Sequence, residues 1–248
     1  MSKLGKEYID QIKTMLDALS DEEMPVIEQA ASMLADAIIQ DHSIFAFGCT
    51  HSSLPIQDLV YRAGGLILIN PIYAPGLTAM DSRPPTLSTS LERISGFAAA
   101  LLDNTPIRAG DVLIVVSVAG RNHLPIEMAK IAKERGLKVI AVTSRAYSAQ
   151  VPSRHPSGKK MHEFADIVLD DKVSKGDAVL AAEGVPQKFC PASGVINAAL
   201  LQTLIAVTIE KLLEQGFTPP IIRAANIEGG DEWNKKLFEQ YKDHVFYL

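Results

Sequence analysis

Cysteines are scarce in this sequence, and long apolar segments are absent from it. With only Cys49 and Cys190 among 248 residues, a small fold stapled by several disulfides is excluded. No apolar run reaches the ~20 residues that cross a bilayer. The longest candidate, 195–213, is interrupted by six polar or charged residues: Asn197, Gln202, Thr203, Thr208, Glu210 and Lys211. No charged leader with a following apolar segment opens the chain, so we expect a cytoplasmic protein with no membrane partner.

Positive charge is also in short supply. Lys and Arg number 24 against 29 Asp and Glu, which gives a formal net charge of −5. Because nucleic acids and anionic membranes attract concentrated Lys and Arg, this balance argues against both as partners. A small anion needs only one local basic site and stays compatible with the composition.

Nucleotide and metal signatures are missing as well. The turn 48–53 lacks G-x-G-x-x-G, and no GK[ST] follows any predicted strand, which argues against nicotinamide and nucleoside triphosphate ligands. Six histidines and two cysteines show none of the short ligand spacings of a structural zinc site. We therefore predict neither a cofactor nor a metal.

The most informative segment that is present is 111–144, DVLIVVSVAGRNHLPIEMAKIAKERGLKVIAVTS. Its residues 112–116 form an apolar, β-branched run typical of a strand buried on both faces. An amphipathic helix follows just beyond Gly120 and ends at Gly136, and 138–142 is a second buried strand. A helix that starts at the carboxyl end of a strand gathers unpaired N–H groups, an arrangement that favours an anion.

The same alternation of strand and helix runs along the chain. Strands are predicted at 43–47, 66–69, 112–116, 138–142 and 167–169, and helices at 54–62, 91–102, 192–215 and 232–241. Two helices precede them, one ending near Leu19 and one running from a Ser20 and Glu23 capping box to about Gln40. The predicted fold is α/β: a flavodoxin-like, three-layer α/β/α sandwich with a five-stranded parallel sheet, preceded by two N-terminal helices.

The chain is long enough for one generous core. We expect a single domain with a helical arm at 1–40, a body at 41–215 and a tail at 216–248. Segments 70–85 and 173–191 are predicted to be irregular. In parallel sheets, ligands bind outside the carboxyl ends of the strands, so the turns that follow the strands are the expected site.

Two of these turns resemble the sugar isomerase (SIS) family of phosphosugar-binding domains. FGCTHSS (47–53) stands where that family has a Gly-rich turn ending in serine, and VVSVAGRN (115–122) stands where it has S-x-S-G-x-[ST]. The likeness covers roughly 5–215. Within the family, YRAGGL (61–66) and the tail 218–241 are most similar to a bacterial group labelled as phosphoheptose isomerases.

The resemblance implies a phosphate site built from the turns after the first, third and fourth predicted strands. Its predicted members are Ser52, Ser53, Ser117, Gly120, Arg121, Asn122 and Ser144. Ala119 departs from the family motif, which has a second serine there, and Asn122 replaces a hydroxyl. Backbone N–H groups at 120–122 need no side chain, and Arg121 can bind phosphate with two hydrogen bonds.

Catalytic residues are less clearly marked. Isomerisation between aldose and ketose needs a base, commonly Glu, and a second acid/base, commonly His. In heptose isomerases and related etherases the Glu lies on the helix after the first turn, a position that Arg62 occupies here. Asp58 and Glu92 are the predicted alternatives for the base, and His51 and His123 for the second group. Where heptose isomerases carry a His at the start of the long C-terminal helix, Asn197 is the nearest polar residue.

Plainer roles compete with each of these. Ser52 and Ser117 are also good helix caps, Asp58 suits a solvated helix face, and Glu92 beside Arg93 suits a surface charge pair. A basic cluster after the fourth strand is either a solvated loop or a lid over an anionic substrate; it comprises Arg145, Arg154, His155, Lys159 and Lys160.

Three hypotheses follow from these residues. The first is an aldose–ketose isomerase acting on a sugar or amino-sugar phosphate. The second is a phosphosugar sensor or regulatory protein without turnover, consistent with the missing Glu and His. The third is a phosphosugar lyase or etherase, which uses the same base. Because SIS domains usually pair, the resemblance also implies a homo-oligomer, a homodimer or a tetramer.

Overall fold

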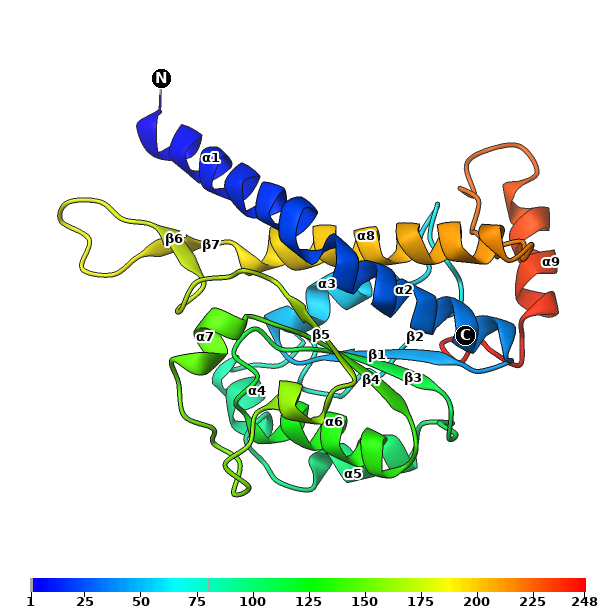
Figure 1. Ribbon diagram of the computed structural model, residues 1–248, viewed down its shortest axis with the longest axis horizontal. Helices are drawn as coiled ribbons and strands as arrows, with labels where there is room; N and C mark the ends of the chain where they lie inside the picture. Colours follow the sequence, from blue (N-terminus) through cyan, green and yellow to red (C-terminus); the bar gives the residue numbers. More distant parts are fainter. Residues whose placement is uncertain (1, 80) are drawn as a thin grey trace.

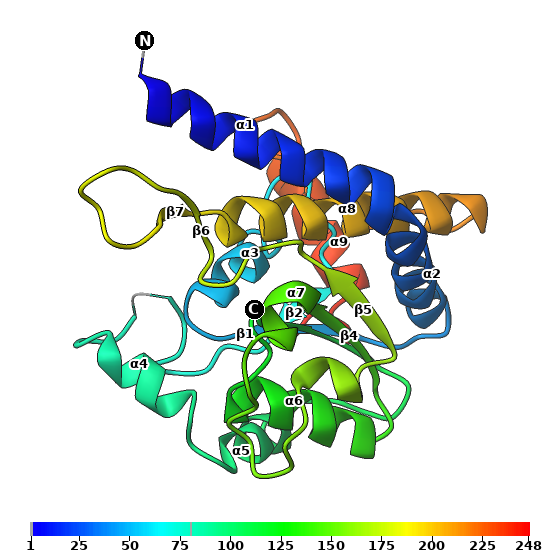
Figure 2. The same ribbon diagram turned by 60° about the vertical axis from the view of Figure 1, so that its left-hand side comes forward.

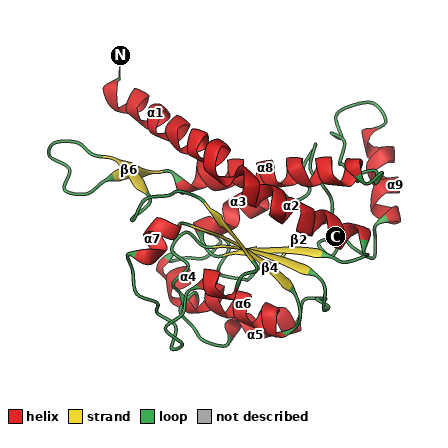
Figure 3. Ribbon diagram, viewed as in Figure 1, coloured by secondary structure: helices red, strands yellow, loops and turns green. Residues whose placement is uncertain are grey.

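The computed structural model describes residues 2–79 and 81–248, and its centre is a parallel sheet of five strands (Figures 1 and 3). The strands lie in the order β2-β1-β3-β4-β5. Their bounds are Ile44–Gly48 (β1), Ile69–Pro71 (β2), Val112–Val116 (β3), Lys138–Thr143 (β4) and Ile167–Asp170 (β5). The predicted three-layer α/β/α sandwich is confirmed. Because all strands run the same way, their carboxyl ends share one edge.

Helices cover both faces of the sheet (Figure 1). They are α1 Lys3–Ala18, α2 Met24–Ile39, α3 Leu54–Gln57, α4 Thr86–Leu91, α5 Phe97–Asp103, α6 His123–Glu134, α7 Arg145–Ala149, α8 Ser193–Glu214 and α9 Gly230–Gln240. One core joins α2, α3 and α8 to one face, and a second joins α5 and α6 to the other. Side chains of β1 alternate between them, Ile44 in the first core and Phe45 in the second, as the period of two in a strand requires.

The two predicted N-terminal helices are present as α1 and α2, but the predicted break between them is absent. A π-helical segment, Leu19–Glu23, joins α1 to α2 in one long helix. Ser20 is exposed and caps nothing, whereas Glu23 is buried. The Glu23 carboxylate lies 2.7 Å from Lys172 Nζ and accepts a hydrogen bond from Asp170 N–H. Glu23 therefore makes a tertiary contact with the end of β5 in place of the expected capping box.

Other boundaries differ where pairing partners are distant in sequence. The second strand begins at Ile69, later than predicted, because 66–67 pairs with the tail: Leu66 bridges Ile221 and Ile67 N–H donates to the Pro220 carbonyl. The helix predicted over 54–62 ends at Gln57.

The segment 173–191 is not wholly irregular. It contains an antiparallel hairpin of β6 (Ala178–Leu180) and β7 (Phe189–Pro191). The hairpin projects beside α1, as both views show (Figures 1 and 2). Tyr8 Oη of α1 donates to the Pro191 carbonyl at 2.9 Å. A hairpin alone is marginally stable, and this contact with α1 supports it.

The long C-terminal helix is confirmed as α8, Ser193–Glu214. By length and composition it is apolar enough to cross a membrane, and half of its apolar window is buried inside the protein. α8 packs against α1, α2 and α3. Such a buried core helix passes the same compositional test as a membrane span.

Candidate functional site

The turns after β1 and β3 begin side by side at the carboxyl edge of the sheet. The register pairs Gly48 with Val116, the last residues of the two strands. The first turn folds back tightly, because a Cβ on Gly48 would lie 2.3 Å from the Ser52 carbonyl oxygen. Thr50 has a φ of +51°, rare for a β-branched residue. Strain of this kind is commonly found where a loop is shaped for a ligand.

The first turn gives its two serines different roles. Ser53 is buried, and its hydroxyl donates to the Thr50 carbonyl and accepts from Gln57 Nε2 and Ala79 N–H. These three hydrogen bonds use the one donor and two acceptor positions of the hydroxyl. Ser53 therefore stabilises the turn and has no position left for a ligand. His51 is exposed and Ser52 is half-buried in the 3₁₀ helix His51–Ser53. Both side chains are accessible to a ligand at this edge.

The second turn is shaped around Gly120. Its φ is +56°, and a Cβ there would lie 3.2 Å from Thr143 Oγ1, so glycine suits both the conformation and the space. Gly120 N–H donates to the Ser117 carbonyl at 3.1 Å, so this amide does not remain free for an anion. The half-buried Ser117 and the start of α6 at Asn122 complete the turn.

Arginines gather at the start of α6. Arg154 Nη1 donates to Asn122 Oδ1 at 2.8 Å, and Arg154 N–H donates to the Arg121 carbonyl. Burial, followed by the charges of Arg121 and Arg93, lowers the pKa of Arg154. Arg121 Nε is buried without a hydrogen-bond partner among the described residues. Clustered guanidinium groups and an unpartnered donor at a helix N-terminus favour an anionic ligand.

Glu92 lies against this cluster because the helix predicted over 91–102 is broken. The chain leaves α4 at Glu92 and re-enters a helix only after Gly96, whose φ is +85°. The Glu92 carbonyl accepts a hydrogen bond from Leu124 N–H, in the first turn of α6, at 3.1 Å. The Asn122 side chain lies near enough to the Glu92 carboxylate to affect its pKa.

Burial raises the pKa of Glu92, while the nearby Asn122 amide and the charges of Arg93 and Arg154 oppose that rise. A raised pKa beside a cationic cluster is the environment that a carboxylate acid/base needs. Of the two predicted candidates for the base, the structure brings Glu92 to the second turn. Burial, followed by the negative charge of Glu92, also raises the pKa of Cys49 in the first turn, so the thiol is neutral at physiological pH.

Asp58 lies elsewhere. Its carboxylate pairs with Arg62 and accepts a hydrogen bond from Gln202 Nε2 of α8 at 3.1 Å. The side chain is 42% exposed. Asp58 therefore serves the contact between the end of α3 and α8, and its partners are not residues of the two turns.

Two histidines meet beside the second turn. The rings of His123 and His155 lie 5.6 Å apart, edge to face. His123 Nδ1 is buried without a partner among residues 2–79 and 81–248. Burial lowers the pKa of His155, although the charge of Glu127 acts to raise it. Glu127 was not among the predicted site residues. The signal that could have indicated it is a charged residue between the apolar residues Ile126 and Met128.

Two further predicted residues build the scaffold. Ser144 is fully buried, and its hydroxyl donates to the Val173 carbonyl and accepts from Tyr147 N–H, which caps α7. Lys160 Nζ donates to the carbonyls of Ser148 and Val151 near the end of α7. The basic cluster therefore divides: Arg154 and His155 face the second turn, while Lys160 holds α7.

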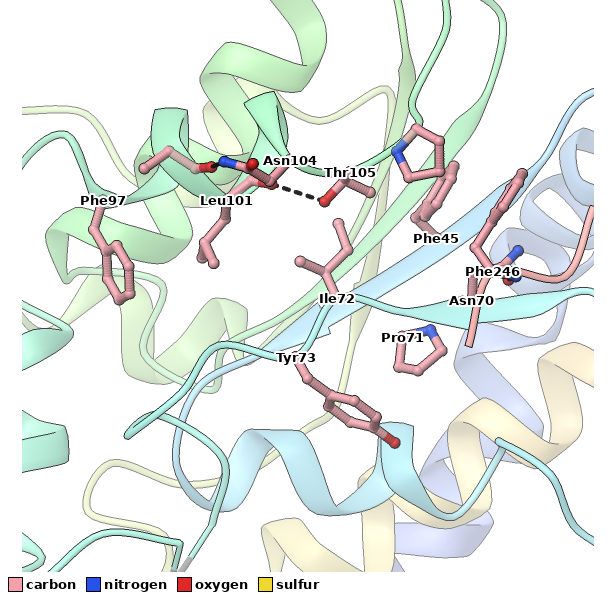
Figure 4. Close-up of a pocket in the computed structure, with 12 residues that line it drawn as sticks. Phe45, Asn70, Pro71, Ile72, Tyr73, Phe97, Leu101, Asn104, Thr105 and Phe246 are labelled. Carbon is pink, nitrogen blue, oxygen red and sulfur yellow. Dashed lines mark hydrogen bonds between the residues drawn. The ribbon is translucent and has the colours of Figure 1, made fainter. Parts of the chain in front are cut away.

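A cavity of about 430 Å³ lies at the β2 edge of the sheet, and none of the predicted site residues lines it (Figure 4). Phe246 of the tail stacks on Phe45 there, with ring centroids 5.8 Å apart. Asn70 Oδ1 accepts from Phe246 N–H, and Asn70 Nδ2 donates to the His244 carbonyl. These contacts dock the tail, so we place the candidate site at the two turns. Within the described ranges 2–79 and 81–248, no group of three or more His, Cys, Asp or Glu is arranged to hold a metal ion.

The chain is similar to several known proteins. The profile of the SIS domain matches residues 7–144. A UPF0309 protein of Streptomyces coelicolor is 47% identical, with 99% of this chain and 98% of the relative covered. One from Oceanobacillus iheyensis is 41% identical over 98% of both chains. Among solved structures, a phosphoheptose isomerase of Neisseria gonorrhoeae is similar with a TM-score of 0.54 and 20% identity, covering 84% of this chain and 97% of its own. At that identity the likeness shows the fold alone.

Proposed function

The chain belongs to the SIS domain family, and we propose that it binds a sugar phosphate at the two turns and interconverts its aldose and ketose forms. The observation that carries this proposal is that an acid and an arginine meet at the Asn122 side chain: Arg154 donates to Asn122 Oδ1, and Asn122 and Arg154 both act on the pKa of Glu92, which burial raises. The arginine can hold the anionic phosphate, and the acid can move a proton at a carbon atom a short distance from that phosphate.

The phosphate would lie between the turns. Ser52 and Ser117 supply hydroxyls, Arg121 and Arg154 supply guanidinium groups, and Asn122 opens α6 with its positive dipole end. Gly120 gives the second turn its shape. Ser53 and Ser144, which were also predicted to bind phosphate, act by holding the first turn and α7 in place.

Glu92 is the proposed base. Its ionised carboxylate would take the proton from carbon 2 of an open-chain aldose phosphate, leaving an enediolate, and would return the proton to carbon 1 of the ketose. The hydroxyl proton must also move, from the oxygen on carbon 2 to the oxygen on carbon 1, and His123 is the proposed group for that transfer. His51, exposed on the first turn, is the alternative for the same task.

The test is a thermal-shift panel of hexose, heptose and amino-sugar phosphates, followed by proton exchange at carbon 2 in deuterium oxide. A ligand at ~100 times its Kd adds about 2.7 kcal/mol to the free energy of unfolding, so a binder produces a clear rise in Tm. Exchange together with a new sugar supports isomerisation. A flat panel that also shows no response to inorganic phosphate contradicts the proposed function.

A second candidate is a phosphosugar sensor without turnover. Arg62 supports it, because that residue occupies the position of the family's catalytic Glu and pairs with Asp58. Binding without any exchange would favour the sensor, and exchange without a new sugar would favour a lyase or etherase. Exposed apolar side chains on the outer helices, Leu4, Ile9, Val195 and Leu213, support a homo-oligomer, which light scattering would test.

A further inference from the structure

Glu127 is a buried carboxylate on α6 that the proposed chemistry does not use. It is 6% exposed. Its Oε1 accepts a hydrogen bond from Ser95 Oγ at 2.6 Å, and its Oε2 accepts one from Gly96 N–H at 2.7 Å. Hydrogen bonds to an ionised carboxylate are short and strong, and burial strengthens them further. The loop between α4 and α5 is therefore held to α6 through this side chain.

The same carboxylate contacts a second loop. His155 Nε2 lies 3.7 Å from Glu127 Oε1, and the His155 side chain is 10% exposed. Ser157 N–H donates to His155 Nδ1 at 3.2 Å. A neutral imidazole that accepts at Nδ1 carries its proton on Nε2, and that proton faces Glu127. One buried side chain thus meets two segments that are far apart in sequence.

These two segments carry the charged groups of the candidate site. Ser95 and Gly96 follow Glu92 and Arg93 in the first loop, and His155 follows Arg154 in the second. Neither loop has the backbone hydrogen bonding of a helix or strand at these positions. Loops of this kind hold a site accurately only when a rigid element fixes them. α6 is such an element, and Glu127 is its contact with both loops.

We propose that Glu127 is the positioning residue of the site: from α6 it ties the Glu92 loop to the Arg154 loop, and so keeps Glu92, Asn122 and Arg154 in one connected set. The inference rests on the proposed function, since it concerns the same site. Glu127 acts through these residues and does not need to touch the sugar phosphate.

The Glu127→Asp variant tests this role because it keeps the charge and shortens the side chain. The shorter carboxylate can no longer contact both loops. Glu92 should become more hydrated, and its pKa should fall toward the ordinary value for glutamate. The measurement is a carboxyl ¹³C NMR titration of the free protein, with Glu92→Gln to assign the signal. The Kd for inorganic phosphate, measured by calorimetry, should rise about fivefold or more as Arg154 loosens. Ser95→Ala, at an exposed position, should move both quantities in the same direction by less.

Glu134→Asp is the matched control, since Glu134 lies on the same helix with a side chain that is 60% exposed and pairs with Lys130. It should behave as the wild type. An unchanged pKa of Glu92 in both Glu127→Asp and Ser95→Ala overturns the positioning role, whatever the phosphate affinity. If the wild type binds neither phosphate nor sugar phosphates, the proposed function fails instead, and the titration of Glu92 still decides the role of Glu127.

Discussion

Asp171 and Asn197 form a buried polar pair between the end of β5 and the start of α8. Asn197 Nδ2 donates to Asp171 Oδ2 at 3.2 Å, and the two residues are 0% and 2% exposed. Asn197 Oδ1 has no hydrogen-bond partner within the described part of the chain. Burial raises the pKa of Asp171 to about 7. A protonated Asp171 can donate to the Asn197 amide oxygen once that amide is turned over.

The first prediction concerns the pH dependence of stability. Because the folded-state pKa of Asp171 lies above its ordinary value of 3.8, its contribution is fully present below about pH 4 and is lost as pH rises toward 7. Asp171→Asn cannot ionise and keeps that contribution. The free energy of unfolding of Asp171→Asn minus that of the wild type should therefore grow between pH 4.5 and 7.5, by about 2–4 kcal/mol. Urea denaturation at both pH values measures this difference. A difference that stays constant with pH would contradict a raised pKa of Asp171.

The second prediction is that Glu92→Gln removes proton exchange at carbon 2 and retains phosphate binding. Loss of a general base costs about 10²–10⁴ in rate. Since the base must be ionised and burial raises its pKa, the rate should rise with pH through a value above that of ordinary glutamate. Asp58→Asn is the control and should exchange at the wild-type rate. Equal loss in both variants would argue against Glu92 as the base.

The third prediction is that Arg154→Ala weakens phosphate binding by about 10- to 100-fold, the effect of one lost hydrogen bond between charged groups. Arg145→Ala removes the same charge from the same basic segment, where Arg145 Nη2 donates to the Val168 carbonyl, and should have much less effect. Calorimetric titration with inorganic phosphate distinguishes the two. Similar losses would indicate a general charge effect without a defined phosphate contact.

The fourth prediction concerns the shape of the first turn. In Gly48→Ala the new Cβ overlaps the Ser52 carbonyl oxygen, so the turn must move, and both Tm and phosphate affinity should fall. Gly194→Ala is the matched control. Its Cβ meets nothing within 4 Å at the start of α8, and replacing glycine within a helix stabilises by about 0.5–1 kcal/mol. A Gly48→Ala protein with unchanged melting would contradict the tight closure.

The central strands could be predicted because their information is local. The segments 112–116 and 139–142 are buried on both faces, and continuous apolar residues report that directly. Features that depend on partners distant in the sequence could not be predicted. The late start of β2 depends on Ile221 in the tail, and the join of α1 to α2 depends on Glu23 meeting Lys172.

The same limit applied to the candidate site. The turns after β1 and β3 were predicted from their small and hydroxylic residues, because a sheet edge gathers whatever follows its strands. The break that carries Glu92 to α6 was hidden, since apolar periodicity over 91–102 favours one continuous helix. Gly96 permits the break, and Glu127, 31 residues later, stabilises it.

The pairing of Gly48 with Val116 has a kinetic consequence. β1 and β3 are neighbours at the centre of the sheet, yet the whole segment 49–111 separates them along the chain. A molecule held between their two turns closes that loop without a covalent bond and acts as a removable cross-link. Its effect should therefore extend to amide hydrogen exchange in both strands, which would slow together on binding and recover together on dialysis.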